Sequence, residues 1–383
     1  MSTTVAPFPV RLAAFDRKDL PGDFNSKEIA DFAISPDNRR IAVAFTGGGT
    51  DHMIEGWLSE WEIETKKLVA QVRLPNPISP GWSFIAIFHR TIQYTPDGTE
   101  IIVQAGRDLY AFYSDSLNLH HSASYADLAG GSASEKNDRR FAISSDGGTL
   151  AVLSGQSLYP QSFGVLHLYK ISTGEELSHW QLPLQVTSIS LSPSGDRVLV
   201  TAPGSPDATD ILLLESLTGR VIKSFASGFR HQLGAGLNAQ FVDTDHFVVT
   251  PGGLTDEKGN YLGNALRVFD WQTGTVTGDL TYHQFGPTGE MEISSDTRKL
   301  AMLNLWRSPL KRRFTESGGS AKAQLLFFQL GESTPYCVLG PLPEDKGTES
   351  NSGYLRFSPD LGLVGLFMNH AVSLYRVPEC RPK

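Results

Sequence analysis

One short pattern occurs seven times along the chain, and this repeat constrains the fold more than any other feature. In each copy, a segment of alternating apolar residues ends in a polar turn, and an aliphatic segment follows. The copies begin about 50 residues apart. They are Phe32–Asp37, Ile92–Asp97, Phe141–Asp146, Ile189–Ser194, Ala239–Thr244, Met291–Asp296 and Leu355–Asp360.

Each copy predicts a β-strand that enters a hairpin. Proline fits the first central position of a type I turn, and Ser, Thr and Asp side chains bond back to the local backbone. A second strand is then expected immediately after the turn. The expected second strands are Ile41–Phe45, Ile101–Ala105, Leu150–Ser154, Val198–Ala202, Phe247–Pro251, Leu300–Asn304 and Leu363–Phe367.

A third strand follows in every unit, and most units turn through Thr-Gly into a fourth. Examples of third strands are Val165–Ile171, Ile211–Glu215, Leu266–Trp271 and Leu325–Leu330. Four antiparallel strands at this period are typical of a β-propeller blade, because one such sheet cannot bury both of its faces alone. The sequence therefore predicts an all-β, seven-bladed β-propeller with four-stranded antiparallel blades.

The last unit stops after its third strand, Ala371–Val377, whereas Val10–Phe15 is a spare strand-like segment before the first unit. If Val10–Phe15 joins the last blade, it closes the ring and removes an open sheet edge. We therefore expect one domain over residues 1–383. Residues 1–28 would hold the closing strand and lead-in, and residues 29–383 the seven blades.

Composition limits the classes of partner and compartment. The net charge of −8 argues against general nucleic-acid binding. No apolar run could cross a membrane, and the first thirty residues do not resemble an intact signal peptide, so we expect a cytoplasmic protein without membrane contact. A secreted mature form stays open. The two cysteines, Cys337 and Cys380, do not make a disulfide framework.

The Ser-Pro-Asp turns of Ser35–Asp37 and Ser358–Asp360 resemble those of the WD-repeat and related bacterial propeller families. The Trp-Asp pair that names WD repeats is missing, since the corresponding third strands read Glu60-Trp61-Glu62-Ile63 and Val268-Phe269-Asp270-Trp271. The resemblance covers nearly the whole chain and implies a divergent WD-like propeller. Members of these families mostly serve as binding platforms, with scattered enzymes such as lactonases, and fold alone does not choose between them.

Loop length indicates where a functional face would lie. The hairpins between strands one and two and between strands three and four are short, and both lie on one rim of a propeller. The long connections belong to the other rim, and long loops on a rigid scaffold commonly carry function. These connections are Thr46–Glu55, Pro75–Arg90, Ala129–Arg139, Gly155–Gly164, Gly252–Asn264, Leu305–Ala323 and Gly340–Gly353.

Aromatic and arginine side chains on this rim are the candidate contacts for a protein partner, because such residues dominate interface centres. The loop after Leu305 also combines basic and aromatic residues, which could grip an acidic partner or a nucleic acid; a solvated loop is the alternative. The candidate binding residues are Trp82, Phe84, Tyr159, Tyr261, Trp306, Arg307, Arg312 and Phe314.

The first strands predict a second candidate site. Their alternating polar positions would line the central channel, and the charged members are Asp31, Arg140, Glu290, Glu292 and Arg356. Carboxylates beside arginines could hold a divalent cation or act as acid and base on a small molecule. A wet polar channel with internal ion pairs is the alternative.

Two functions remain open. The first is a non-enzymatic binding platform that uses the long-loop face, and we favour it because a binding surface needs no motif. The second is a lactonase-like hydrolase or lyase at the channel mouth, and its candidate catalytic residues are Arg140, Glu290, Glu292, Arg356, His231 and His283. No metal-ligand spacing or cofactor motif is present, so neither a metal nor a cofactor is expected.

Overall fold

The computed structural model describes most of the chain, and the statements below concern only these residues. They are 5–6, 9–21, 26–48, 54–76, 78, 91–106, 108–124, 140–154, 164–182, 186–202, 209–229, 237–251, 254–255, 261–282, 291–294, 299–306, 322–329, 332, 335–340, 354–368 and 371–378.

Seven β-sheets account for the regular structure of these residues, and they group into two compact units. Three sheets belong to the unit of residues 9–130 and 347–379. In hydrogen-bonded order their strands are β28 (Tyr354–Phe357), β29 (Leu363–Met368), β30 (Ala371–Arg376) and β2 (Arg11–Asp16); β3 (Ser26–Ile34), β4 (Arg40–Gly48), β5 (Ile54–Glu62) and β6 (Leu68–Leu74); and β7 (Ile92–Tyr94), β8 (Glu100–Ala105), β9 (Asp108–Tyr113) and β10 (Leu119–Ser124).

Four sheets belong to the other unit, which holds residues 1–8, 131–346 and 380–383. Their strands are β11 (Arg140–Ile143), β12 (Thr149–Ser154), β13 (Val165–Lys170) and β14 (Glu175–Gln181); β15 (Ser188–Leu191), β16 (Arg197–Thr201), β17 (Ile211–Glu215) and β18 (Val221–Phe225); β19 (Leu237–Phe241), β20 (His246–Pro251), β22 (Tyr261–Asp270) and β23 (Val276–Tyr282), with β21 (Leu254–Thr255) also on β22; and β24 (Met291–Ile293), β25 (Lys299–Trp306), β26 (Lys322–Gln329), β27 (Cys337–Leu339) and β1 (Val5–Ala6).

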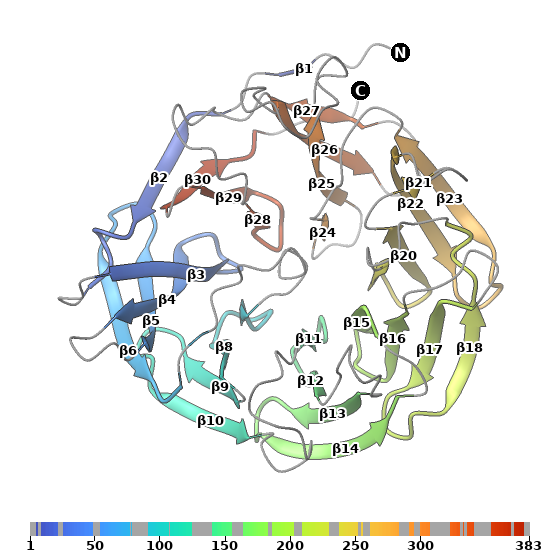
Figure 1. Cartoon of the computed structure of the whole chain (residues 1–383), viewed down its shortest axis with the longest axis horizontal. Helices are drawn as coiled ribbons and strands as arrows, with labels where there is room; N and C mark the ends of the chain where they lie inside the picture. Colours follow the sequence, from blue (N-terminus) through green and yellow to red (C-terminus); the bar gives the residue numbers. More distant parts are fainter. Residues whose placement is uncertain are drawn as a thin grey trace. The chain divides into compact units, whose positions relative to one another are not determined.

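Each sheet has the consecutive four-strand antiparallel order that the repeat predicts (Figure 1). The chain is therefore a seven-bladed β-propeller, and the predicted fold class is confirmed. All seven predicted second strands are present, and most differ from the prediction by only one or two residues at an end. The single domain stays a prediction.

The N-terminal strand completes the last blade, as the sequence predicts. Strand β2 pairs antiparallel with β30, so that Arg11 lies opposite Tyr375 and Phe15 opposite Val372. Phe15 is fully buried. Strand β1 was not predicted: its two residues pair parallel with β27, and two residues are too few to show a period.

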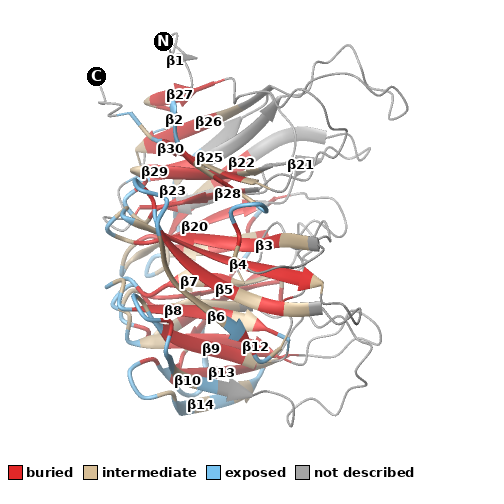
Figure 2. Cartoon of the chain, turned by 90° about the vertical axis from the view of Figure 1, so that its left-hand side faces the viewer, coloured by how far each residue is buried: buried red, intermediate tan, exposed pale blue. Residues whose placement is uncertain are grey.

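Apolar side chains pack between neighbouring blades within each unit. In the three-blade unit, one cluster joins Phe15 and Val372 of the last blade to Phe32 and Val43 of the first. Second strands such as β4 are almost entirely buried, whereas the fourth strand β14 is mostly exposed, as the red and pale blue of Figure 2 show. Within each unit, neighbouring blades thus bury apolar faces against one another, which is why the repeat needs several copies.

Several predicted long loops are shorter than expected because hairpins extend into them. Strands β4 and β5 stay paired as far as Gly48 and Ile54, within the predicted loop Thr46–Glu55. Strands β25 and β26 stay paired as far as Trp306 and Lys322. The predicted loop Gly252–Asn264 contains β21 and the start of β22. In all three cases the strands stay paired beyond their predicted ends, so fewer residues are left in the loop than the sequence predicts.

Two further observations concern membrane-spanning helices and disulfides. Within the described ranges, the structure has no helix that is long and apolar enough to span a bilayer. Cys337 in β27 is disulfide-bonded, and the chain's other cysteine, Cys380, lies outside the described residues. Disulfides persist mainly in oxidising compartments, so this bond does not support the predicted cytoplasmic location, which stays a prediction.

Candidate functional site

Two of the predicted channel residues form a buried ion pair. Arg356 of β28 lies with Nη2 3.2 Å from Oδ1 of Asp31 in β3, and both residues are buried. The backbone N–H of Phe32 donates to Oδ1 of Asp31 at 2.8 Å, and the N–H of Thr91 donates to Oδ2 at 2.8 Å. Asp31 therefore connects the first strand of its own blade to those of the last and second blades.

The equivalent polar positions of the four-blade unit also connect neighbouring first strands. The hydroxyl oxygen of Ser188 in β15 accepts the backbone N–H of Ala239 in β19 at 3.0 Å, and Ser190 accepts that of Phe241 at 3.1 Å. The alternating polar residues that the sequence predicts as channel lining thus bond one blade to the next.

The remaining channel and catalytic candidates are described in part or not at all. Arg140 lies in β11 and Glu292 in β24, but their side chains are outside the described structure. Glu290, His231 and His283 lie outside the described residues, so the structure tests no convergence of these groups.

Most predicted binding residues also fall outside the described residues. This group comprises Trp82, Phe84, Tyr159, Arg307, Arg312 and Phe314. Tyr261 begins β22 and Trp306 ends β25, so both lie on strand backbone rather than in a loop, although their side chains are not described. Their role in binding stays a prediction.

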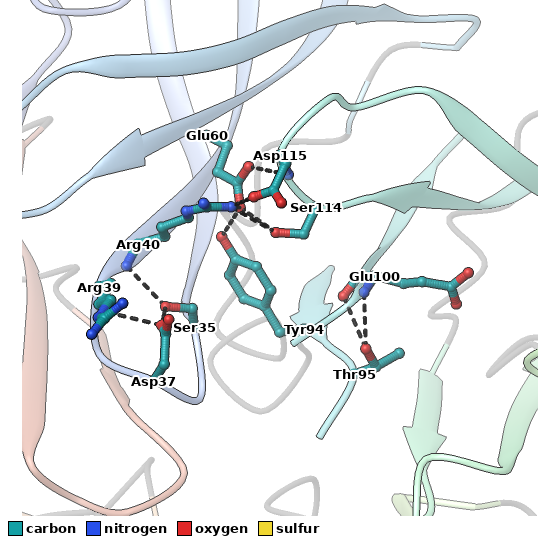
Figure 3. Close-up of polar contacts among 10 residues, drawn as sticks. All are labelled: Ser35, Asp37, Arg39, Arg40, Glu60, Tyr94, Thr95, Glu100, Ser114 and Asp115. Atoms are coloured by element: carbon teal, nitrogen blue, oxygen red, sulfur yellow. Dashed lines mark hydrogen bonds and ion pairs between the residues drawn. The ribbon is translucent and has the colours of Figure 1, made fainter. Parts of the chain in front are cut away.

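A buried carboxylate that the sequence analysis missed joins the first and second blades. Glu60 of β5 is fully buried, and its Oε1 accepts the hydroxyls of Tyr94 at 2.9 Å and Ser114 at 2.7 Å (Figure 3). Its Oε2 accepts the backbone N–H of Asp115 at 2.8 Å. Arg40 lies 3.7 Å from Oε1.

This carboxylate perturbs its neighbour and has little capacity for a ligand. Burial, followed by the charge and hydrogen bond of Glu60, raises the pKa of Tyr94 well above its usual value, so the phenol stays protonated and donates. Both oxygens of Glu60 are engaged, which fits a bond between blades. Glu60 shares one face of β5 with the fully buried Leu58, and Ser59 on the opposite face is buried as well.

Two clusters of histidine and glutamate outside the predicted sites have ligand atoms within 4.8 Å of one another. One contains Glu100, His120 and His121. The other contains His167, Glu176 and His179, with Glu176 Oε1 2.9 Å from Nδ1 of His167 and 3.0 Å from Nδ1 of His179. Either set of side chains is of the kind that holds a transition metal.

A β-bulge explains why the sequence analysis missed the second cluster. Glu176 and His179 are three residues apart, so a regular strand would point them to opposite faces. The register of β13 and β14 shifts between Leu168 and Tyr169, which leaves Leu177 as the extra residue. Glu176 and His179 consequently share one face. Only the pairing itself reveals this.

Comparison with known proteins finds similarity in fold but not in sequence. No protein-family model and no curated protein matches the sequence. Among solved structures, the WD40 domain of coronin from Toxoplasma gondii is similar, with a TM-score of 0.57 and 12% identity over 99% of this chain and 90% of that chain. A chain of the mitotic checkpoint complex matches with a TM-score of 0.59 and 11% identity, covering 99% and 94%.

Hydrazine synthase from Kuenenia stuttgartiensis is similar to the same degree, with a TM-score of 0.55 and 13% identity over 94% of this chain and 98% of that chain. The similar structures thus include a WD40 domain, a chain of a complex and a chain of an enzyme, and their likeness shows the fold rather than the activity. The seven blades and these likenesses together identify the fold as a seven-bladed β-propeller.

Proposed function

We propose that the chain is a protein-binding platform whose contacts lie at the end of the blades that carries the long connections. The difference between the two ends of several blades supports this proposal. At one end, strands one and two are joined by turns as tight as Ser35–Arg39, and strands three and four by turns as tight as Ser216–Arg220. At the other end, residues 155–164 separate β12 from β13, and residues 307–321 separate β25 from β26.

The tight turns satisfy their own polar groups. Ser35 Oγ donates to Asp37 at 2.6 Å and accepts the N–H of Arg40 at 2.9 Å. Glu215 accepts the hydroxyl of Thr218 at 2.5 Å. At this end few polar groups are left to bind a partner. The long connections, in contrast, can vary in sequence without destabilising the sheets that carry them.

A protein is the proposed class of partner. The propeller fold is similar to that of a chain crystallised in a multi-protein assembly, the mitotic checkpoint complex. The lactonase-like alternative needs a charged channel residue that can reach substrate. In the described structure, Asp31 and Arg356 are instead paired with each other and hydrogen-bonded to backbone.

The double variant Trp306→Ala, Arg312→Ala tests this proposal. Both residues belong to the β25–β26 connection or its border. Removing an aromatic and an arginine anchor should weaken partner binding at least tenfold, which corresponds to about 1.4 kcal/mol, while leaving the melting temperature unchanged. A tagged parent protein first identifies the partner by pull-down and mass spectrometry, and calorimetry with the purified partner then measures affinity.

A matched control carries the same kind of change at the opposite end. Leu217 and Arg220 lie in the tight β17–β18 turn, where Leu217 is 58% exposed. The double variant Leu217→Ala, Arg220→Ala should bind the partner like the parent. Equal affinity of both double variants and the parent would reject the long-connection end as the binding face, and loss in the control alone would place the contact at the turns.

A further inference from the structure

We propose that His167, Glu176 and His179 form a binding site for a divalent transition-metal ion of the zinc class. His167 lies in β13, and Glu176 and His179 lie in the neighbouring strand β14. His167 and His179 are direct cross-strand partners, and the bulge at Leu177 brings Glu176 to the same face. The site is therefore built on paired backbone rather than on a loop.

The separations of the ligand atoms suit one small ion. Oε1 of Glu176 lies 2.9 Å from Nδ1 of His167 and 3.0 Å from Nδ1 of His179. Ligands placed 2.0–2.1 Å from a tetrahedral zinc ion are about 3.3 Å apart. Small side-chain rotations of the two surface residues would therefore admit the ion without movement of the strands.

Ser154 orients the buried ligand. His167 is fully buried, and its Nε2 lies 3.1 Å from Oγ of Ser154 in β12. Oγ of Ser154 also lies 3.5 Å from the carbonyl oxygen of Val165, and when the hydroxyl points there its oxygen can accept the Nε2–H of His167. In that tautomer the lone pair of Nδ1 faces Glu176. Outer hydrogen bonds of this kind fix the orientation of metal-ligating imidazoles.

The chemistry of the three groups favours a positive ion between them. A carboxylate oxygen and two imidazole lone pairs are all acceptors, so their convergence requires either protons or a metal ion between them. Two nitrogen ligands and one oxygen ligand suit Zn²⁺, Co²⁺, Ni²⁺ or Cu²⁺, whereas Ca²⁺ and Mg²⁺ prefer oxygen ligands alone.

The site is open to solvent on one side. The side chain of His179 is 60% exposed and that of Glu176 is 38% exposed, whereas His167 is buried beneath them. An ion can reach the site from solution, and water can complete its coordination. Three protein ligands and one open position are typical of accessible zinc sites.

The test compares Zn²⁺ binding by the full chain and by three single variants. His179→Ala removes an exposed ligand, so the fold should survive, and affinity for Zn²⁺ should fall at least tenfold. Control variant His246→Ala removes another histidine that pairs with a carboxylate three residues away, Asp243 at 3.0 Å. No third ligand joins that pair among the described residues, and the control should therefore bind Zn²⁺ like the parent.

Competition with a chromogenic chelator measures affinity, and thermal shift with ZnCl₂, CoCl₂ and MgCl₂ measures selectivity. Glu100, His120 and His121 form a second cluster that could also bind Zn²⁺. The quantity to compare is therefore the difference in Zn²⁺ binding between His179→Ala and His246→Ala, rather than the total metal bound. Ser154→Ala should weaken Zn²⁺ binding about tenfold, by releasing His167.

Loss of one Zn²⁺ equivalent in His179→Ala, with no response to MgCl₂, would support the site. Equal Zn²⁺ affinity of His179→Ala and His246→Ala would overturn it. The two histidines would then be joined only by protons that they share with the carboxylate of Glu176. Failure of the platform proposal would leave this result untouched, since the two tests use different residues and different ligands.

Discussion

The carboxylate of Asp37 shows how a single residue of the repeat holds a blade turn. It accepts the hydroxyl of Ser35 at 2.6 Å and the backbone N–H of Arg39 at 3.0 Å. Thr95 and Asp97 repeat this arrangement in the second blade, where the hydroxyl donates at 2.6 Å. The Ser/Thr-x-Asp spacing in the sequence therefore records a hydrogen-bond pattern and not merely a preference for polar residues.

These bonds change the pKa of the turn carboxylates. Burial alone raises the pKa of Asp37, but the hydrogen bonds of Ser35 and Arg39 and the charges of Arg39 and Arg40 outweigh it, so the pKa is lowered. Hydrogen bonds likewise outweigh burial and lower the pKa of Asp97. A pKa below the unfolded value of about 3.9 stabilises the fold above that pH, and the contribution disappears as pH falls through the folded-state pKa.

We predict that Asp37→Asn lowers the melting temperature at pH 7, because the amide lacks the charge that these donors favour. The contribution of this charge declines once the pH falls below the unfolded pKa of about 3.9, so the difference in melting temperature between variant and parent should be smaller at pH 3 than at pH 7. Melting curves at both pH values measure this. Glu64→Gln is the control, since Glu64 is exposed and its partner Arg376 lies 4.0 Å away. An Asp37→Asn difference of equal size at both pH values would contradict the prediction.

At this scale the sequence predicts which residues are polar but not what they contact. Asp31 and Arg356 were predicted as polar positions on first strands, and both are. Their mutual pairing depends on which blades are neighbours, and the approach of Glu176 to His167 depends on a bulge. Contacts set by pairing between distant segments leave no local pattern.

Strand β2 shows what is predictable at the scale of an element. The segment Val10–Phe15 is apolar apart from Arg11, and the structure places Arg11–Asp16 on the edge of β30. Ala13 and Phe15 are buried, whereas Val10 is 90% exposed. A spare apolar segment and a last unit without a fourth strand together were sufficient for this prediction.

We predict that deletion of residues 1–15 destabilises the protein or makes it oligomerise, because β30 would become an open edge. The milder change Phe15→Ala should cost about 3–5 kcal/mol by leaving a cavity in the cluster around Phe32. Urea unfolding and size-exclusion chromatography measure both effects. Val10→Ala, at an exposed position, should change neither. A monomeric truncation with the parent's stability would show that β2 does not secure the blade.

Element boundaries at the long connections were less predictable. Strand β25 continues to Trp306, and β21 forms inside a segment read as loop. Extension of a hairpin depends on cross-strand hydrogen bonds rather than on apolar alternation, so polar or glycine-containing strand ends resemble loops in the sequence. This moves Trp306 from a loop to a strand end without deciding what its side chain contacts.

At the scale of the whole molecule, the repeat predicts the fold because the same strand–turn–strand pattern occurs in every blade. Seven copies average out the irregularities of any one, such as the unit from Ala239 to Thr244, which lacks proline. Function has no such redundancy. A binding surface or a metal site occurs once, and its residues come from separate segments.

The sequence also predicts a single domain, whereas the described contacts group into two compact units. Repeat arrays couple each blade to its neighbours, so one unfolding transition is expected, although long arrays can lose this cooperativity. Each unit offers a fully buried phenylalanine as a probe: Phe15 in the unit of three blades and Phe247 in the unit of four.

We predict that calorimetry of the parent shows one transition and that Phe15→Ala and Phe247→Ala each move the whole of it to lower temperature. Phe247 packs against Phe225 and Phe269 with ring centroids 5.1 Å away in both cases, so its loss should also cost about 3–5 kcal/mol. If the units unfold independently, the parent shows two transitions and each variant moves only one. That outcome would mean that the chain has two domains rather than one. Strand β2 would then stabilise the three-blade unit alone.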